Sequence, residues 1–123
     1  MKTVATNHAP AALGPYAQAQ VSGSFVFTSG QIGIDPATGV IPDGIEAQAH
    51  QVFRNLTAVL QAAGSDMSMD VQTTLFIKNM DDFATVIAIF AGYFSEPFPA
   101  RSCVEVARLP KDVLVECEVI AEA

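Results

Sequence analysis

The fold is decided by residues 45–78, which read IEAQAHQVFRNLTAVLQAAGSDMSMDVQTTLFIK. Apolar residues in the first half recur at steps of three and four, and this spacing predicts an amphipathic helix over 45–63. We expect Asp43 to cap this helix and Gly64 to end it. From 71 to 78 the pattern changes to a period of two, which predicts a strand.

The segment before this stretch has the features of a hairpin followed by a loop. Residues 16–21 and 25–28 are strand-like and flank Ser22-Gly23-Ser24, which predicts a short turn between two strands. Residues 29–44 contain six glycines and prolines, so we expect a loop there.

The segment after residue 78 predicts one more helix and two more strands. The helix extends over 83–94, with Asp81 or Asp82 as its cap, and the strands extend over 101–106 and 113–121. Strands, helix, strand, helix and strands in this order favour an α+β fold with both helices on one face of a mixed sheet. At 123 residues the chain has the length of a single domain, 1–123.

The charge balance narrows the classes of partner. The chain has 13 acidic and six basic residues and a net charge of −7, so we expect it to bind neither nucleic acid nor anionic membranes. A small anionic substrate would need a local cation. No export signal and no apolar run of ~20 residues is visible, so we expect a cytoplasmic protein. Its two cysteines, Cys103 and Cys117, are then expected to be free thiols.

Two polar residues near the C-terminus are candidates for chemistry. Arg101 begins a strand directly after Phe98-Pro99-Ala100, and a guanidinium grips a carboxylate at two points. Glu116 has apolar neighbours on both sides, and burial raises a carboxyl pKa toward the range that suits proton transfer. The same pattern is typical of structural ion pairs, so by itself it identifies no function. His8 and His50 lack metal-ligand spacing, so no metal site is expected.

Four motifs in order along the chain carry a resemblance to a known family. Residues 99–116, PARSCVEVARLPKDVLVE, resemble the C-terminal signature of the RidA/YjgF family. Three further stretches are similar to family motifs: APAALGPY at 9–16, FTSGQ at 27–31 and DFATV at 82–86. The resemblance therefore covers essentially the whole chain.

The resemblance implies a chorismate-mutase-like domain with a six-stranded mixed sheet, assembled as a homotrimer with active sites in clefts between subunits. It implies hydrolysis of reactive 2-imino acids and enamines, such as 2-aminoacrylate, 2-iminopropanoate and 2-iminobutanoate, to 2-oxo acids and ammonia without a metal or organic cofactor. By position, Arg101 would clamp the substrate carboxylate and Glu116 would hold the attacking water. The remaining residues implied to contact substrate or water are Tyr16, Ser29, Gly30 and Cys103, the last two through their backbone.

Two departures from the family pattern bear on the cleft. Asn is common one turn into the second helix, where this chain has Ile87, and the connection Ser95-Glu96-Pro97-Phe98 is shorter than in many relatives. Because this chain has Ile87 in place of Asn, a non-catalytic module that binds small carboxylates remains an alternative function. A ribonuclease or translation inhibitor is disfavoured by the charge of −7, the lack of an aromatic-basic patch and the lack of a histidine pair.

Overall fold

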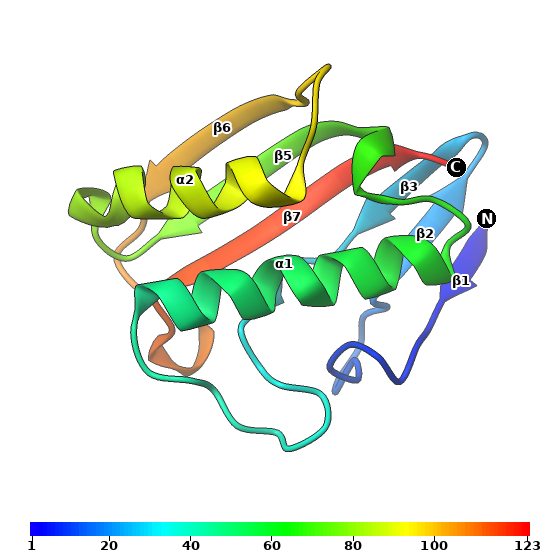
Figure 1. Cartoon of the computed structure of the whole chain (residues 1–123). Helices are drawn as coiled ribbons and strands as arrows, with labels where there is room; N and C mark the ends of the chain where they lie inside the picture. The colour runs from blue at the N-terminus through cyan, green and yellow to red at the C-terminus, as the bar shows by residue number, and fades with distance from the viewer.

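The computed structural model describes residues 1–123 as one mixed sheet with two helices on one face (Figure 1). The elements in chain order are β1 Lys2–Val4, β2 Ala19–Ser22, β3 Phe25–Thr28, β4 Gln31–Ile32, α1 Ile45–Ala62, β5 Asp70–Ile77, α2 Phe83–Tyr93, β6 Ala100–Glu105 and β7 Val115–Glu122. Short 3-10 turns occur at Met67–Met69, Met80–Asp82 and Pro110–Asp112. Neither helix is long and apolar enough to cross a lipid bilayer.

The sheet has six strands in the order β1-β2-β3-β7-β5-β6, and β4 adds a seventh by pairing with β7. The β5–β6 pair is parallel, and the other pairs are antiparallel. The parallel pair follows from α2, which carries the chain back across the sheet before β6 begins. The predicted α+β class and mixed sheet are confirmed, and β6 forms one edge of the sheet.

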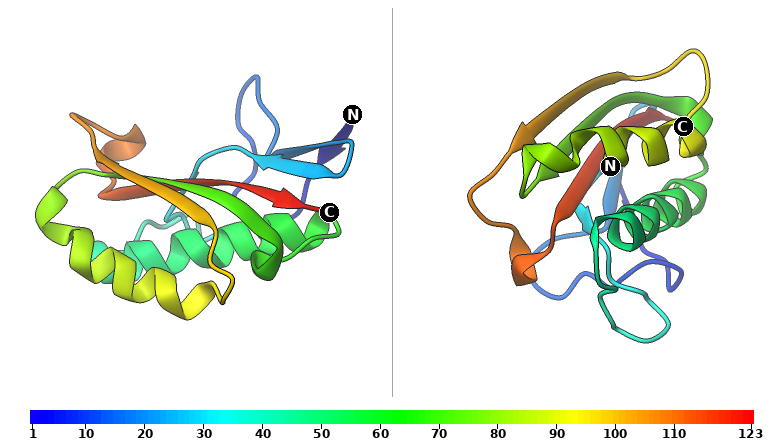
Figure 2. Two further views of the ribbon diagram at one scale, coloured as in Figure 1. Left: turned by 90° about the horizontal axis from the view of Figure 1, so that it is seen from above. Right: turned by 60° about the vertical axis from the view of Figure 1, so that its left-hand side comes forward.

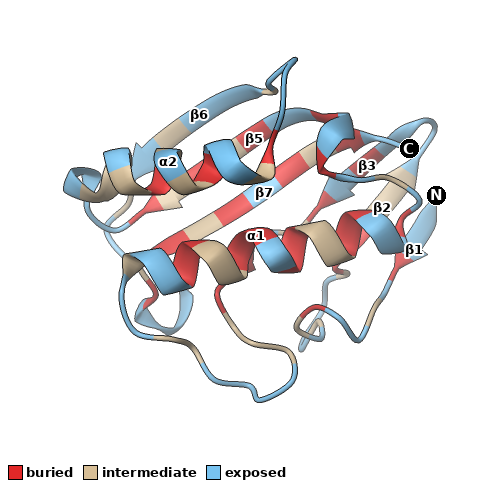
Figure 3. Ribbon diagram, viewed as in Figure 1, coloured by how far each residue is buried: buried red, intermediate tan, exposed pale blue.

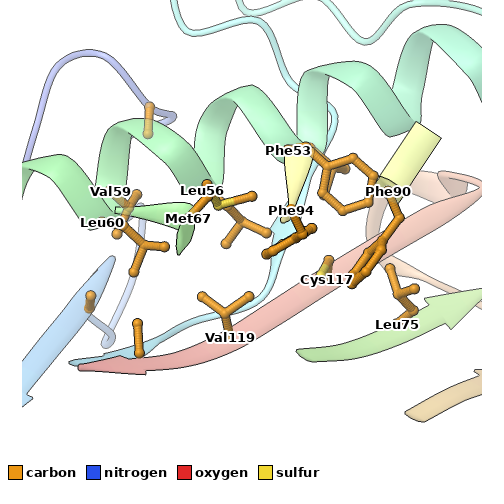
Figure 4. Packing of buried hydrophobic residues seen from close by; sticks show 14 of the residues in the cluster. Phe53, Leu56, Val59, Leu60, Met67, Leu75, Phe90, Phe94, Cys117 and Val119 are labelled. Atoms are coloured by element: carbon orange, nitrogen blue, oxygen red, sulfur yellow. The ribbon is translucent and has the colours of Figure 1, made fainter. Parts of the chain in front are cut away.

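The hydrophobic core lies between the sheet and the helices. The buried residues of α1 follow the predicted stripe, and β7 alternates between buried and more exposed positions (Figure 3). Phe53 of α1 is fully buried and packs its ring against those of Phe90 and Phe94. Figure 4 shows these rings above Cys117, whose side chain points from β7 into the core. Both thiols are free, as predicted.

The opposite face of the sheet has no helix on it (Figure 2, left). It carries several apolar side chains: Phe25 and Phe27 are 38% and 44% exposed, and Val104 is 44% exposed. Ile120 and Phe76 lie on the same face by the register of the strands. Open sheet faces in monomers are usually polar, so this one is suited to contact another protein surface.

Some local predictions were wrong in detail. Gly44, not Asp43, precedes α1, with a φ of 90° and no side-chain cap. Asp82 likewise precedes α2 without a capping hydrogen bond, because Asn79 already caps the preceding 3-10 turn. Gly64 does end α1, with a φ of 82°. The strand β4 lies in the predicted loop, and β1 and β4 are too short for alternation to reveal them.

Asp70 is an acid inside the core. A β-bulge at the start of β5 turns its side chain to the helix face, where it is 9% exposed. Thr73 donates a hydrogen bond to one carboxylate oxygen, and the other oxygen has no partner. Burial raises the pKa of Asp70 from 3.8 to about 7, and the Thr73 hydrogen bond opposes this only in part.

Asp70 is therefore expected to make the fold less stable in alkaline solution. A carboxyl whose folded pKa lies above its unfolded value favours folding most below pH 3.8, and this contribution is lost as the pH rises through about 7. We expect Asp70→Asn to raise the free energy of unfolding at pH 8 by about 1–3 kcal/mol and to have little effect at pH 4. Urea unfolding at pH 4, 6 and 8 measures this, with the exposed Asp43→Asn as control. An Asp70→Asn effect of equal size at every pH would contradict it.

Candidate functional site

Glu116 lies on the open face of the sheet, against a glycine. The short strand β4 pairs with β7 so that Ile32 lies opposite Glu116, and this brings the backbone of Gly30 under the glutamate side chain. A Cβ on Gly30 would lie 2.5 Å from Glu116 Oε1 and 2.9 Å from its Cδ. Only glycine leaves room for the carboxylate here.

The surroundings of Glu116 tune its acidity. The side chain is half-buried, and burial is the main reason that its pKa is raised. The charge of Glu118, two residues along on the same face, raises the pKa further. No group of the chain donates a hydrogen bond to the Glu116 carboxylate, so its oxygens are free to bind water or substrate.

Ser29 directly precedes Gly30, and it is hydrogen-bonded to the segment that carries Tyr16. The Ser29 hydroxyl donates to the Ala17 carbonyl at 2.6 Å, and the Ser29 amide donates to the Gln18 carbonyl at 2.9 Å. These bonds fix the segment that presents Tyr16, whose side chain is 54% exposed. Part of the segment between β1 and β2 rises on the open side of the sheet (Figure 2, left).

Gln18 is a supporting residue that was not predicted from the sequence. Its buried amide donates to the carbonyls of Thr6 and Pro10 and accepts from the Thr6 amide at 2.7 Å. It therefore ties the N-terminal segment to the end of β3. A lone glutamine in a Gly- and Pro-rich stretch carries no pattern that would have marked it.

Arg101 lies on the other face of the sheet. In the parallel pair it is opposite Thr73, which is fully buried and faces the helices. Its guanidinium carbon is 5.6 Å from the centre of the Phe83 ring and 5.7 Å from that of Phe90. Such contacts hold a cation through the ring faces without using its N–H groups.

The Arg101 guanidinium has no acidic partner in the chain. The only ion pair of residues 1–123 joins Arg108 and Asp112 on the surface. The donor fork of Arg101 is therefore available to an external carboxylate. Phe83 and Phe90 lie within the helix predicted over 83–94, but no sequence pattern indicates which cation a ring will contact.

Cys103 shares the face of Arg101 and lies opposite Leu75. Burial raises the pKa of its thiol, and the nearby Arg101 lowers it only in part. A thiol of raised pKa is a poor nucleophile, so the backbone of Cys103 is the better candidate for a ligand contact. No group of three or more His, Cys, Asp or Glu side chains is placed to hold a metal ion.

One chain does not bring Arg101 and Glu116 together. Glu116 lies opposite Phe76, and Phe76 lies opposite Val104, three residues beyond Arg101. Two strand spacings and three residues along a strand separate the backbones by roughly 14 Å. The side chains also project from opposite faces. The structure thus holds two separate groups of candidate residues, one around Glu116 and Gly30 and one around Arg101, which we call half-sites.

A free guanidinium fork and a water-accessible carboxylate of raised pKa are typical of a protein that handles small carboxylic acids. The sequence profile of the family described as Endoribonuclease L-PSP matches residues 6–123. The chain belongs to this family, which is also called RidA/YjgF.

Relatives match over nearly their full length. The chain is 54% identical to a 2-iminobutanoate/2-iminopropanoate deaminase of Salmonella typhimurium, over 98% of this chain and 96% of that protein. The crystal structure of RidA from an Antarctic Psychrobacter is 42% identical, covers all of both chains and superposes with a TM-score of 0.97. The crystal structure of Escherichia coli TdcF with bound serine is 42% identical, covers 100% of this chain and 99% of that chain, and has a TM-score of 0.95.

The close approach at Gly30 leads to a test of the Glu116 half-site. We expect Gly30→Ala to move the Glu116 carboxylate by roughly 1 Å, since a methyl group placed 2.5 Å from Oε1 must recover an ordinary contact of 3.4 Å or more. The flexible end of the glutamate can yield, so the fold should persist. A crystal structure of the variant measures the shift. Gly92→Ala, whose added Cβ meets nothing within 4 Å, is the control. An unmoved carboxylate would refute the steric argument.

Proposed function

We propose that this chain is an imine deaminase that hydrolyses small 2-imino acids, and the enamines that tautomerise to them, to 2-oxo acids and ammonia. The observation that carries the proposal is the combination of an unpaired Arg101 fork with a Glu116 carboxylate seated on Gly30, in a chain 54% identical to a protein named 2-iminobutanoate/2-iminopropanoate deaminase. A relative that binds serine supports a site for a small amino-acid-like carboxylate.

We propose further that the active site forms between copies of the chain in a homotrimer. Arg101 of one copy would meet Glu116, Gly30, Ser29 and Tyr16 of the next. The placement of the two half-sites on opposite faces supports this, because neither is complete alone. The uncovered apolar face of the sheet and the low charged fraction of 15% also support self-association. Each contact is head-to-tail, so the ring must close on itself.

In this site Arg101 binds the substrate carboxylate at two points. The rings of Phe83 and Phe90 hold the guanidinium in place, which limits the freedom of the bound substrate. The reacting carbon, C2, is bonded to the carboxylate carbon and is therefore positioned beside Glu116 of the neighbouring copy. Fixing the imine near a held water replaces a random encounter in solution with a unimolecular step.

Glu116 acts as the base and then as the acid. The water oxygen bonds to C2 while Glu116 takes a water proton, the electron pair of the C=N π bond moves to nitrogen, and Glu116 returns its proton to that nitrogen to give a neutral carbinolamine. Glu116 then takes the carbinolamine hydroxyl proton and delivers it to the nitrogen as the C=O bond forms and the C–N bond breaks. Ammonia leaves with the 2-oxo acid as the other product. The raised pKa of Glu116 favours both transfers near neutral pH, and no step requires a metal or organic cofactor.

Mixing two inactive variants tests the shared site. We expect Arg101→Ala and Glu116→Gln each to lower kcat/KM by about 100-fold or more, since one loses the carboxylate clamp and the other the base. Unfolded together at equal amounts and refolded, they should recover about a quarter of the wild-type activity, because half of the Arg101 donors and half of the Glu116 donors are intact. The assay follows 2-oxo acid release from an imine generated in situ.

Separate refolding of each variant is the control. No recovery on mixing, with assembly shown by light scattering, would exclude a site shared between copies. Binding of 2-oxobutanoate without hydrolysis of any imine would instead identify a carboxylate-binding module.

The effect of the Glu118 charge on Glu116 can be tested through the pH dependence of activity. Glu116 must be ionised to accept a proton, so kcat/KM should fall as the pH drops through its raised pKa. We expect Glu118→Gln to shift this acidic limb to lower pH, since the Glu118 charge is one cause of the raised value. The measurement is kcat/KM from pH 4 to 8 for both proteins. A shift in the other direction would mean that Glu116 is not the titrating base.

A further inference from the structure

A mostly apolar pocket lies directly beside Arg101. It has a volume of about 480 Å³ and is an open hollow between α2 and the segment that enters β6. Its lining residues are Ile87, Phe90, Ala91, Phe98, Pro99 and Arg101. Ile87 and Ala91 are four residues apart on α2, so they present adjacent side chains on one face of the helix.

The only charged group in the pocket is the Arg101 guanidinium. It has no acidic partner, and the Phe83 and Phe90 rings hold it at the pocket wall. A cation next to hydrocarbon walls is complementary to a carboxylate that carries an apolar chain. A ligand with a second charge would leave that charge without a partner against Ile87 and Phe98.

The geometry of a 2-imino acid matches this arrangement. Its C2 carries the carboxylate, the nitrogen and the side chain in one plane, so the side chain diverges from the carboxylate by one carbon. When Arg101 binds the carboxylate and the nitrogen points toward Glu116 of the neighbouring copy, the substrate side chain points along the apolar wall of the pocket. A methyl group would reach little of the apolar wall formed by Ile87 and Phe98, whereas a longer aliphatic chain would contact more of it.

We infer that Ile87, Ala91 and Phe98 form the subsite for the substrate side chain, and that this subsite selects 2-imino acids with longer aliphatic chains over the imine of alanine. The inference rests on the proposed deaminase function and adds its substrate preference. Each additional buried CH₂ should raise kcat/KM by about fourfold.

The test compares the imines of alanine, 2-aminobutanoate, norvaline and leucine, each generated in situ by an amino-acid oxidase. For the wild-type chain we expect the leucine-derived imine to exceed the alanine-derived imine in kcat/KM by about tenfold or more. Ile87→Ala and Phe98→Ala should reduce this ratio to about threefold or less. Phe98 is 52% exposed, so its replacement should leave the fold intact.

Ile89→Ala is the matched control. It is the same residue type on the same helix, but it lines a hollow with Glu46 and His50 on the side facing away from the subsite. Its ratio should equal that of the wild type. A wild-type ratio near one, or a ratio unchanged in both subsite variants, would overturn the inference while leaving the deaminase function in place.

The absence of turnover with every imine would overturn the proposed function instead. In that case calorimetric affinities of 2-oxopropanoate and 2-oxo-4-methylpentanoate would decide the inference. Tighter binding of the longer acid, lost in Ile87→Ala and in Phe98→Ala, would support the subsite. Equal affinities would overturn it.

Discussion

Successive side chains of a strand project to opposite faces of the sheet, and the arrangement of this protein's reactive groups depends on that alternation. Register fixes Arg101 beside the buried Thr73, on the helix face, and Glu116 beside Phe76, on the open face. A slip of one residue in either strand would move its reactive side chain to the other face, and a slip of β7 would also expose that strand's core residues. The same hydrophobic core that stabilises the sheet therefore keeps the cation and the carboxylate of one chain apart.

The helices and long strands were predictable because their burial follows a regular period. The stripe of α1 and the alternation of β7 appear in the sequence as they appear in the structure. The shorter elements were not predictable in this way. A two-residue strand such as β4 has no period, yet it places Gly30 under Glu116. The grouping of Gly30 with Glu116 was thus available from the family resemblance and not from the pattern.

The surroundings of the candidate residues were less predictable than their identity. Alternation along a strand puts Arg101 and Cys103 on one face, but it does not say that this face lies beneath α2, since that requires the register between β5 and β6. The contacts of Arg101 with Phe83 and Phe90 depend on how α2 lies across the strand. The burial of Asp70 results from a bulge that shifts the alternation by one residue, and a strictly periodic reading places it incorrectly.

The edge strand β6 also affects how readily the protein aggregates. It is six residues long and forms the edge of the sheet, so one side of its backbone has no partner strand, and its own Val104 is 44% exposed. Free edges of this kind can recruit strands from other molecules, and short length, charge or coverage normally protects them. In the proposed trimer the neighbouring copy would cover this region. Dilution that separates the copies would then expose an edge prone to aggregation. The resistance of the protein to aggregation would therefore depend on how much of it is assembled.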